Sequence, residues 1–507
     1  MTLKGPNRFL LAFAAAVIGG FAAVPAIDVV VDPFWRFDLV TIRGINEQRP
    51  VFSSYARLSK AGAVCRLRPR QVTMGTSRVE VGLDPHHPGW SEEPSPVYNL
   101  GLAGIGLKEL LLNFQHAVNT SPIKRAVIGL DFLMFNANRE ATVFGTEVLD
   151  FDRNQLVLDP GDSCWRTLRY NARRFFGTEG LYYSFLTVTS QLTQADRTDG
   201  TKVTAWMSLY DRDGFRSYFA AGYNLLLDAD GARPKFSELQ EQYYVRKVWR
   251  PPPGYRYCFS KPGQPNTMDT FRELVRIARR SGVDVRFYLE PVHARMMLAI
   301  QDAGLWPQFE DWKRGIVEVL AEEAKESGKP EFPVWDFSGF NSVTDEHIGK
   351  TMRMRWFWED SHYKKETGDL MLDRVLDYHV PEYTIPQDFG VRLRSDNIED
   401  WLVATRKAGR AYVDAEPDEV RRVQETVAGV LEGSAGSNCG YYMDELRTAS
   451  AALHRGDTET ANAAIERAKA IDAADRGRAA EMGVTYWEPG FAAALRTVEE
   501  GGQLSPN

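Results

Sequence analysis

Short apolar runs alternate with amphipathic, helix-like stretches between about residues 53 and 376, and this alternation constrains the fold more than any other feature. The apolar runs cover residues 71–74, 97–100, 126–132, 283–289 and 334–337. Strands that alternate with helices are typical of βαβ units and a parallel sheet, and continuous apolar strands fit a sheet covered on both faces. We therefore predict an α/β fold, a flavodoxin-like three-layer sandwich with a five-stranded parallel sheet.

Helical spacing of apolar residues predicts the elements between and after these strands. We expect helices at about 53–65, 107–118, 268–280, 294–303, 308–327 and 365–376. The pattern weakens between about 136 and 264, which we interpret as a large insertion at the rim of the sheet. Residues 386–394 look like a linker, and residues 391–507 are predicted to form a helical extension. One helical hairpin around residues 451–468 resembles a single tetratricopeptide unit, whereas stable arrays need about three.

The amino end carries an uncharged, mostly apolar run from residue 9 to 27, preceded by Lys4 and Arg8. About 20 such residues can cross a bilayer, and positive charge before the span places the N-terminus in the cytoplasm. We therefore predict a transmembrane anchor at residues 1–31, with the main domain, residues 32–390, in the periplasm or otherwise outside the cytoplasmic membrane. A cleavable signal peptide is the alternative, because Val24-Pro25-Ala26 resembles a processing site.

Charge and cysteine content narrow the classes of partner and compartment. The 507 residues have a formal net charge of −7, and Lys and Arg are scattered, which argues against a nucleic-acid-binding protein. The four cysteines are widely spaced and suggest no metal site. Export would permit one or two disulfides, and buried thiols are the alternative.

Ser77 follows the first predicted strand, in the stretch Met74-Gly75-Thr76-Ser77-Arg78. Ligands of open α/β sheets bind at this edge, beyond the carboxyl ends of the strands. A serine becomes a nucleophile when a histidine removes its proton and a carboxylate orients that histidine. His362 follows the last predicted strand, and Asp360 lies two residues before it. In the alternative interpretation, Ser77 caps a helix and the other two residues form a surface pair.

The chain resembles the SGNH (GDSL-type) hydrolase superfamily, and more narrowly its membrane-anchored, envelope-facing members. The resemblance lies in Gly75-Thr76-Ser77, in Asn99 with Gly104, and in Asp360-x-His362, and it covers about residues 57–376. It implies that Ser77 is the nucleophile, His362 the base and Asp360 the residue that orients the base. It also implies an oxyanion hole formed by the backbone N–H groups of Ser77 and Gly104.

Two positions depart from the family pattern. Thr76 stands where the family has an aspartate before the serine, and Asp131 stands where it has an oxyanion-hole asparagine. An ionised Asp131 would repel an oxyanion. Either Asn99 or Asn136 replaces the missing donor, or Asp131 is structural, or the activity is lost.

Three further polar residues follow strand ends and could border the same crevice. Arg78 could contact an anionic substrate group, with solvation at a helix start as the default, and His293 and Glu290 could equally be packing residues. His86-His87 has no further metal ligands nearby in the sequence. We expect neither a metal nor another cofactor.

Two functions remain open. The first is an exported serine esterase or O-acyltransferase that acts on acyl esters, most plausibly acetyl esters, of an envelope or exported polysaccharide. The second is a non-catalytic envelope protein with the same fold, used for binding, in which the helical extension could contact a protein partner. A distance of roughly 3 Å between Ser77 Oγ and a ring nitrogen of His362 would favour the enzyme.

Overall fold

The computed structural model describes twelve stretches of the chain. They are residues 5–90, 96–137, 153–196, 202–204, 210–217, 232–249, 257–260, 265–348, 354–379, 383–431, 441–482 and 495–502. Outside these stretches lie the three prolines at residues 251–253, Cys439 and parts of the predicted insertion and extension.

The core is a mixed six-stranded sheet in the order β2-β1-β3-β6-β7-β8. Its strands are β1 (Gln71–Gly75), β2 (Val97–Gly101), β3 (Arg125–Leu130), β6 (Asp284–Leu289), β7 (Val334–Asp336) and β8 (Val391–Leu393). All neighbours pair in parallel except β7 and β8. The predicted α/β class is confirmed.

The edge strand β8 corrects the expectation of an all-parallel sheet. It lies in the stretch that we interpreted as a linker, and it comes from the first residues that we assigned to the helical extension. Arg374 fixes this stretch by donating hydrogen bonds to the carbonyl groups of Phe389 (2.6 Å) and Pro386 (2.9 Å). Gly390, with φ +89°, then turns the chain into β8. A strand of three residues is too short for periodicity to reveal.

Helices cover both faces of the sheet. Alternate residues of the central strands enter two different cores, as Ile128 and Val127 of β3 illustrate, and this is the expected period of a strand. On one face lie α3 (Ala56–Leu67), α5 (Leu107–Thr120), α11 (Thr267–Ser281), α12 (Ala294–Asp302) and α13 (Trp306–Ser327). On the other lie α4 (Ser77–Gly82) and α14 (Lys365–Leu376). Gly282 is the C-cap of α11 and is left-handed with φ +65°.

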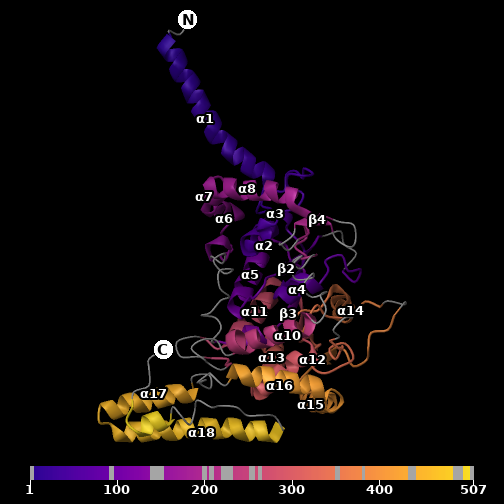
Figure 1. Cartoon of the computed structure of the whole chain (residues 1–507), viewed down its shortest axis with the longest axis vertical. Helices are drawn as coiled ribbons and strands as arrows, with labels where there is room; N and C mark the ends of the chain where they lie inside the picture. Colours follow the sequence, from indigo (N-terminus) through magenta and orange to yellow (C-terminus); the bar gives the residue numbers. More distant parts are fainter. Residues whose placement is uncertain are drawn as a thin grey trace.

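A long N-terminal helix, α1 (Gly5–Val31), projects away from the body (Figure 1). Within it, Phe9–Val31 is long and apolar enough to cross a membrane, either as an anchor or as a signal sequence. Helices α2 (Val51–Ser54), α6 (Cys164–Tyr170), α7 (Ala172–Phe175) and α8 (Thr178–Ser190) belong to the end of the body from which α1 emerges. A disulfide between Cys65 and Cys164 joins α3 to α6, whereas Cys258 is a buried free thiol.

The described parts of the insertion and the C-terminal helices pack on the sheet domain. Helix α10 (Ala232–Tyr243), continued by a π-helix (Tyr244–Trp249), meets α16 (Pro417–Leu431), and α15 (Ile398–Ala415) shares the main core. Arg295 of α12 binds both Glu241 of α10 (2.7 Å) and Glu419 of α16, and all three side chains are buried. Because a buried charge needs a partner, this triad ties three separate parts of the chain together.

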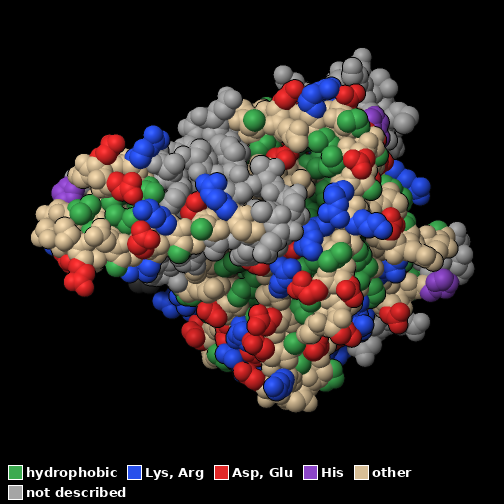
Figure 2. All heavy atoms as spheres, turned by 90° about the horizontal axis from the view of Figure 1, so that it is seen from below, with side chains coloured by type: hydrophobic (Ala, Val, Ile, Leu, Met, Phe, Trp, Pro, Cys, Tyr) green, Lys and Arg blue, Asp and Glu red, His purple; other side chains and the backbone are tan. Residues whose placement is uncertain are grey.

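Helices α17 (Tyr441–His454) and α18 (Thr458–Met482) form an antiparallel hairpin with a small core of its own. The predicted helical hairpin is therefore present. At this end of the molecule, acidic and basic side chains are interspersed over the described surface (Figure 2).

Candidate active site

Ser77 is the first residue of α4, directly beyond the carboxyl end of β1. Gly75 permits the tight turn: its φ is +154°, and a Cβ there would lie 2.4 Å from Val79. The N-cap of α4 is Thr76, whose hydroxyl accepts a hydrogen bond from the N–H of Arg78 (3.3 Å). Ser77 is thus not the capping residue, and its partly exposed side chain is available for another partner.

That partner is His362. The Oγ atom of Ser77 lies 2.8 Å from Nε2 of His362, although 285 residues separate the two in the chain. His362 sits in a loop in which its carbonyl accepts a hydrogen bond from the N–H of Trp358 (2.8 Å) and Phe357 bridges to Tyr363. With 9 % exposure, the imidazole is shielded from bulk water but open toward Ser77. This contact meets the distance that we set for a nucleophile and its base.

The carboxylate that contacts Nδ1 of His362 belongs to Glu359, and not to Asp360 as we predicted. Glu359 is fully buried and also accepts hydrogen bonds from the N–H (2.6 Å) and the hydroxyl (3.0 Å) of Ser361. Burial raises the pKa of Glu359, but His362 and these hydrogen bonds outweigh it and lower the pKa to about 2. Glu359 is therefore ionised at neutral pH and fixes the tautomer of His362 that leaves Nε2 as an acceptor.

Asp360 is not the partner of the imidazole, whose Nδ1 contacts Glu359 and the hydroxyl of Ser361 (2.9 Å). Both of its carboxylate oxygens are buried and accept no hydrogen bond from the described residues. Burial, reinforced by repulsion from Glu359 and Glu241, raises the pKa of Asp360 well above its usual range. This shift favours the protonated form of Asp360, which can donate a hydrogen bond to Glu359.

Arg78 and Asp131 form a buried ion pair under the turn. Arg78 is therefore neither solvated at the helix start nor available to bind an anionic substrate group. The charge of Asp131, which would otherwise repel an oxyanion, is neutralised by Arg78. Asp131 also accepts a hydrogen bond from the N–H of Leu133 (3.2 Å). Arg78 donates to the carbonyl of Ser361 (2.5 Å) and to the hydroxyl of Tyr244 (3.1 Å), so it links the serine turn to the histidine loop.

The loop that carries Gly104 is held from α3. Arg57 donates to the carbonyl of Ala103 (3.0 Å) and pairs with Glu109 (2.6 Å), while the fully buried Lys60 donates to the carbonyl of Gly101 (2.7 Å). Gly104 itself has φ +65°, a conformation that glycine adopts without strain. These two basic residues were not singled out from the sequence, where they read as ordinary members of a helix.

The two asparagines that could have replaced the family's oxyanion donor have other partners. Asn99 donates to the carbonyl groups of Val79 (2.8 Å) and Leu83 (2.9 Å). Asn136 donates to the carbonyl of Val248 (2.9 Å), and its oxygen accepts from the N–H of Cys258 (3.3 Å). Both amides therefore brace the backbone.

His293 has a structural position. Its side chain caps α12 by accepting from the N–H of Arg295 (3.2 Å), and its other nitrogen contacts the carbonyl of Glu346. Burial lowers its pKa to about 4, so His293 is neutral. It is a packing histidine, which was the alternative interpretation.

A small cavity of about 20 Å³ lies beside Arg78, Asp131 and Glu290, with Tyr244 and Trp249 among the residues that line it. It has room for about one water molecule. Glu290 is fully buried, and this desolvation raises its pKa to about 7, although Arg78 opposes the shift. A Cβ on Gly75 would lie 3.4 Å from Oε1 of Glu290, so this carboxyl supports the strand end below Ser77.

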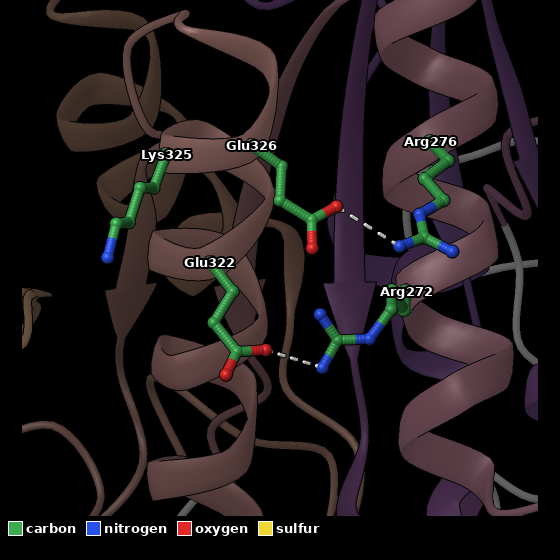
Figure 3. Close-up of a pocket in the computed structure, with 5 residues that line it drawn as sticks. All are labelled: Arg272, Arg276, Glu322, Lys325 and Glu326. Carbon is green, nitrogen blue, oxygen red and sulfur yellow. Dashed lines mark hydrogen bonds and ion pairs between the residues drawn. The ribbon is translucent and has the colours of Figure 1, made fainter.

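Outside this region, the structure offers little that could hold a cofactor. A larger surface hollow of about 620 Å³ lies between α11 and α13, and neither Ser77 nor His362 lines it. Its guanidinium groups are paired across the helices, Arg272 with Glu322 (2.7 Å) and Arg276 with Glu326 (3.3 Å) (Figure 3). Among the described residues no cluster of His, Cys, Asp and Glu could hold a metal ion. His87, which stood beside His86 as a possible ligand, is paired with Asp373 (3.1 Å).

Sequence reasoning brought Ser77 and His362 together and missed Glu359. A signal was present in the sequence, because Glu359 and Asp360 are adjacent and either carboxylate can reach an imidazole two or three residues further along the chain.

No protein-family model matches the chain, and no curated protein matches it.

Proposed function

We propose that the chain is a serine esterase or O-acyltransferase of the SGNH type, which acts through a Ser77–His362–Glu359 triad. The observation that carries the proposal is the pair of contacts on His362, Ser77 Oγ at Nε2 (2.8 Å) and the ionised Glu359 at Nδ1. A binding module would need neither a hydroxyl aligned with a ring nitrogen nor a carboxylate behind it. The five parallel strands support the fold assignment. Numbered by their place in the sequence, they lie across the sheet in the order 2-1-3-4-5, which is that of flavodoxin-like sheets.

In the proposed reaction, His362 Nε2 takes the proton of Ser77 as Oγ attacks the ester carbonyl. Glu359 stabilises the imidazolium that forms. The alcohol then leaves with that proton, and an acyl group remains on Ser77. A water molecule or a sugar hydroxyl, activated by His362, attacks the acyl group and restores the serine. The first acceptor makes the protein an esterase and the second an acyltransferase.

The oxyanion hole in this proposal consists of backbone N–H groups of Ser77 and Gly104. The first N–H groups of a helix have no partner within that helix, and Ser77 is the first residue of α4. Each well-aligned donor contributes about 3 kcal/mol to the stability of the tetrahedral intermediate. Asp131 does not oppose this role, because Arg78 neutralises it.

We further propose that the catalytic domain lies outside the cytoplasmic membrane, with α1 as its anchor and the N-terminus in the cytoplasm. The disulfide Cys65–Cys164 supports this location, since disulfides persist in oxidising compartments. The proposed substrate in that location is an acyl ester, in particular an acetyl ester, on an envelope or exported polysaccharide.

The test is hydrolysis of an aryl acetate and release of acetate from an acetylated polysaccharide by the full-length protein in detergent. Ser77→Ala should abolish turnover while the folded state, followed by circular dichroism, is unchanged. Equal turnover by the wild type and the alanine variant would refute the proposal.

A further inference from the structure

Several large apolar side chains of helix α8 are exposed to solvent, which is unusual for a helix that packs on a globular body. Its fully buried residues are small or polar, namely Gly180, Ser184, Thr187 and, just beyond the helix, Gln191. Beside them the half-buried Tyr183 packs against Phe34. Toward solvent it turns Leu181, Tyr182 and Phe185, and Leu192 in the turn that follows is exposed as well. We call these four residues the α8 apolar face. Phe185 is 64 % exposed and Leu192 is 80 % exposed. Surface helices of soluble domains show the opposite arrangement, and a cluster of exposed apolar side chains marks an interaction surface.

The inner face of α8 is fixed to the end of α1. The hydroxyl of Ser184 donates to Asp28 of α1 (2.9 Å), and a Cβ on Gly180 would lie 2.6 Å from the same carboxylate. At the other end, Gln191 exchanges two hydrogen bonds with the backbone of Gln48 (2.8 and 3.2 Å). These contacts prevent α8 from rotating to bury its apolar face, so the face is a permanent feature of the surface.

This face lies at the foot of the helix that can cross a membrane. In Figure 1, α8 runs across the base of α1, at the end of the body from which α1 projects. A bilayer that contains α1 would therefore have its surface near α8, with α8 roughly in its plane.

Neighbouring α6 and α7 add the side chains that membrane interfaces favour. Trp165 and Tyr170 are 69 % and 52 % exposed, and aromatic residues of this kind gather at the headgroup level. Three exposed arginines accompany them, Arg166, Arg169 and Arg173. Apolar and aromatic residues beside basic ones are typical of helices that lie on anionic lipid surfaces.

We propose that α6 and α8 form a membrane-docking surface, on which the α8 apolar face enters the headgroup region of the bilayer that holds α1. The arginines of α6 and α7 contact anionic phospholipid headgroups. The docked body has one fixed orientation relative to the membrane instead of swinging on α1. The inference depends on α1 lying in a bilayer and is independent of the proposed enzymatic activity.

Photocrosslinking of the full-length protein in phospholipid vesicles tests the proposal. The photoreactive residue p-benzoylphenylalanine replaces Phe185 in one variant, Phe13 of α1 in a second and Val403 of α15 in a third. Val403 is a matched control, because it is 53 % exposed on a helix at the opposite end of the body. Mass spectrometry then measures phospholipid adducts on each variant.

We expect abundant lipid adducts at positions 13 and 185 and several-fold fewer at position 403. Arg169→Glu with Arg173→Glu should reduce the adducts at position 185 in vesicles that contain phosphatidylglycerol, and should have less effect in pure phosphatidylcholine. Adducts at position 185 no more abundant than at position 403 would overturn the proposal, as would adducts at position 185 to a second protein chain. Absence of adducts at position 13 would overturn it too, because α1 would then not lie in the bilayer.

Discussion

Replacing Glu359 by glutamine removes the buried carboxylate that contacts Nδ1 of His362 and keeps the shape of the side chain. The variant loses the charge that stabilises the imidazolium formed when Ser77 gives up its proton. An amide can also present its N–H₂ group to Nδ1, which would favour the tautomer with the proton on Nε2. That tautomer cannot accept a proton from Ser77.

The size of the effect follows from the geometry. A carboxylate and an imidazolium about 4 Å apart interact by about 4 kcal/mol at an effective dielectric constant of about 20. Loss of about 3–4 kcal/mol lowers kcat by about 10²–10³-fold. The isosteric change Asp360→Asn is the matched control, because neither carboxylate oxygen of Asp360 accepts a hydrogen bond from the described residues and its raised pKa favours the neutral form that asparagine resembles. It should leave kcat nearly unchanged.

The assay is aryl acetate hydrolysis by both variants at pH 7, with circular dichroism to compare their folded states. A large loss of kcat in Asp360→Asn together with wild-type activity in Glu359→Gln would refute the assignment. It would return the orienting role to the carboxylate that the family resemblance implied.

Three predictions concern stability, measured by thermal or denaturant unfolding. The pKa of Glu290 is raised to about 7, so its neutral form favours the folded state. That contribution is complete below about pH 4.5 and is lost as the pH rises through 7. At about 1.4 kcal/mol per pKa unit, this contribution amounts to about 3 kcal/mol. Glu290→Gln should therefore gain stability relative to the wild type as the pH rises from 5 to 8. A difference in unfolding free energy between variant and wild type that does not change with pH would contradict this. Arg78→Met leaves Asp131 buried without its partner and should cost about 3–5 kcal/mol, and Arg78→Met with Asp131→Asn should recover part of that loss; equal losses in both would show that the pair contributes little. Cys65→Ala with Cys164→Ala opens a loop with a sequence separation of 99 residues and should cost about 5 kcal/mol in the chain-entropy model, so an unchanged unfolding midpoint would argue against this disulfide.

The strand and helix pattern was readable from the sequence because long apolar runs with a clear period encode it. Helix α14, for example, begins and ends where the spacing of apolar residues places it. The edge strand β8 was not readable, since three residues carry no period and its partner β7 lies far away in the chain.

The candidate site was predictable where it depends on strand ends and not where it depends on loop geometry. Ser77 follows β1 and therefore lies at the predicted edge. The choice between Glu359 and Asp360 depends on how one loop turns, which residue spacing does not determine. The Arg78–Asp131 pair could not be predicted either, because the two residues follow different strands. The sequence shows that Asp131 replaces the family's asparagine, but it does not show which residue neutralises the charge of Asp131.

Covalent trapping of Ser77 tests the central claim most directly. A fluorophosphonate probe reacts with a serine that a neighbouring base has activated, and peptide mass mapping identifies the modified residue. We predict that the probe labels Ser77 in the wild type and that labelling is lost in His362→Ala, which retains the serine. Labelling elsewhere, or equal labelling of Ser77 with and without His362, would contradict an activated serine at this site.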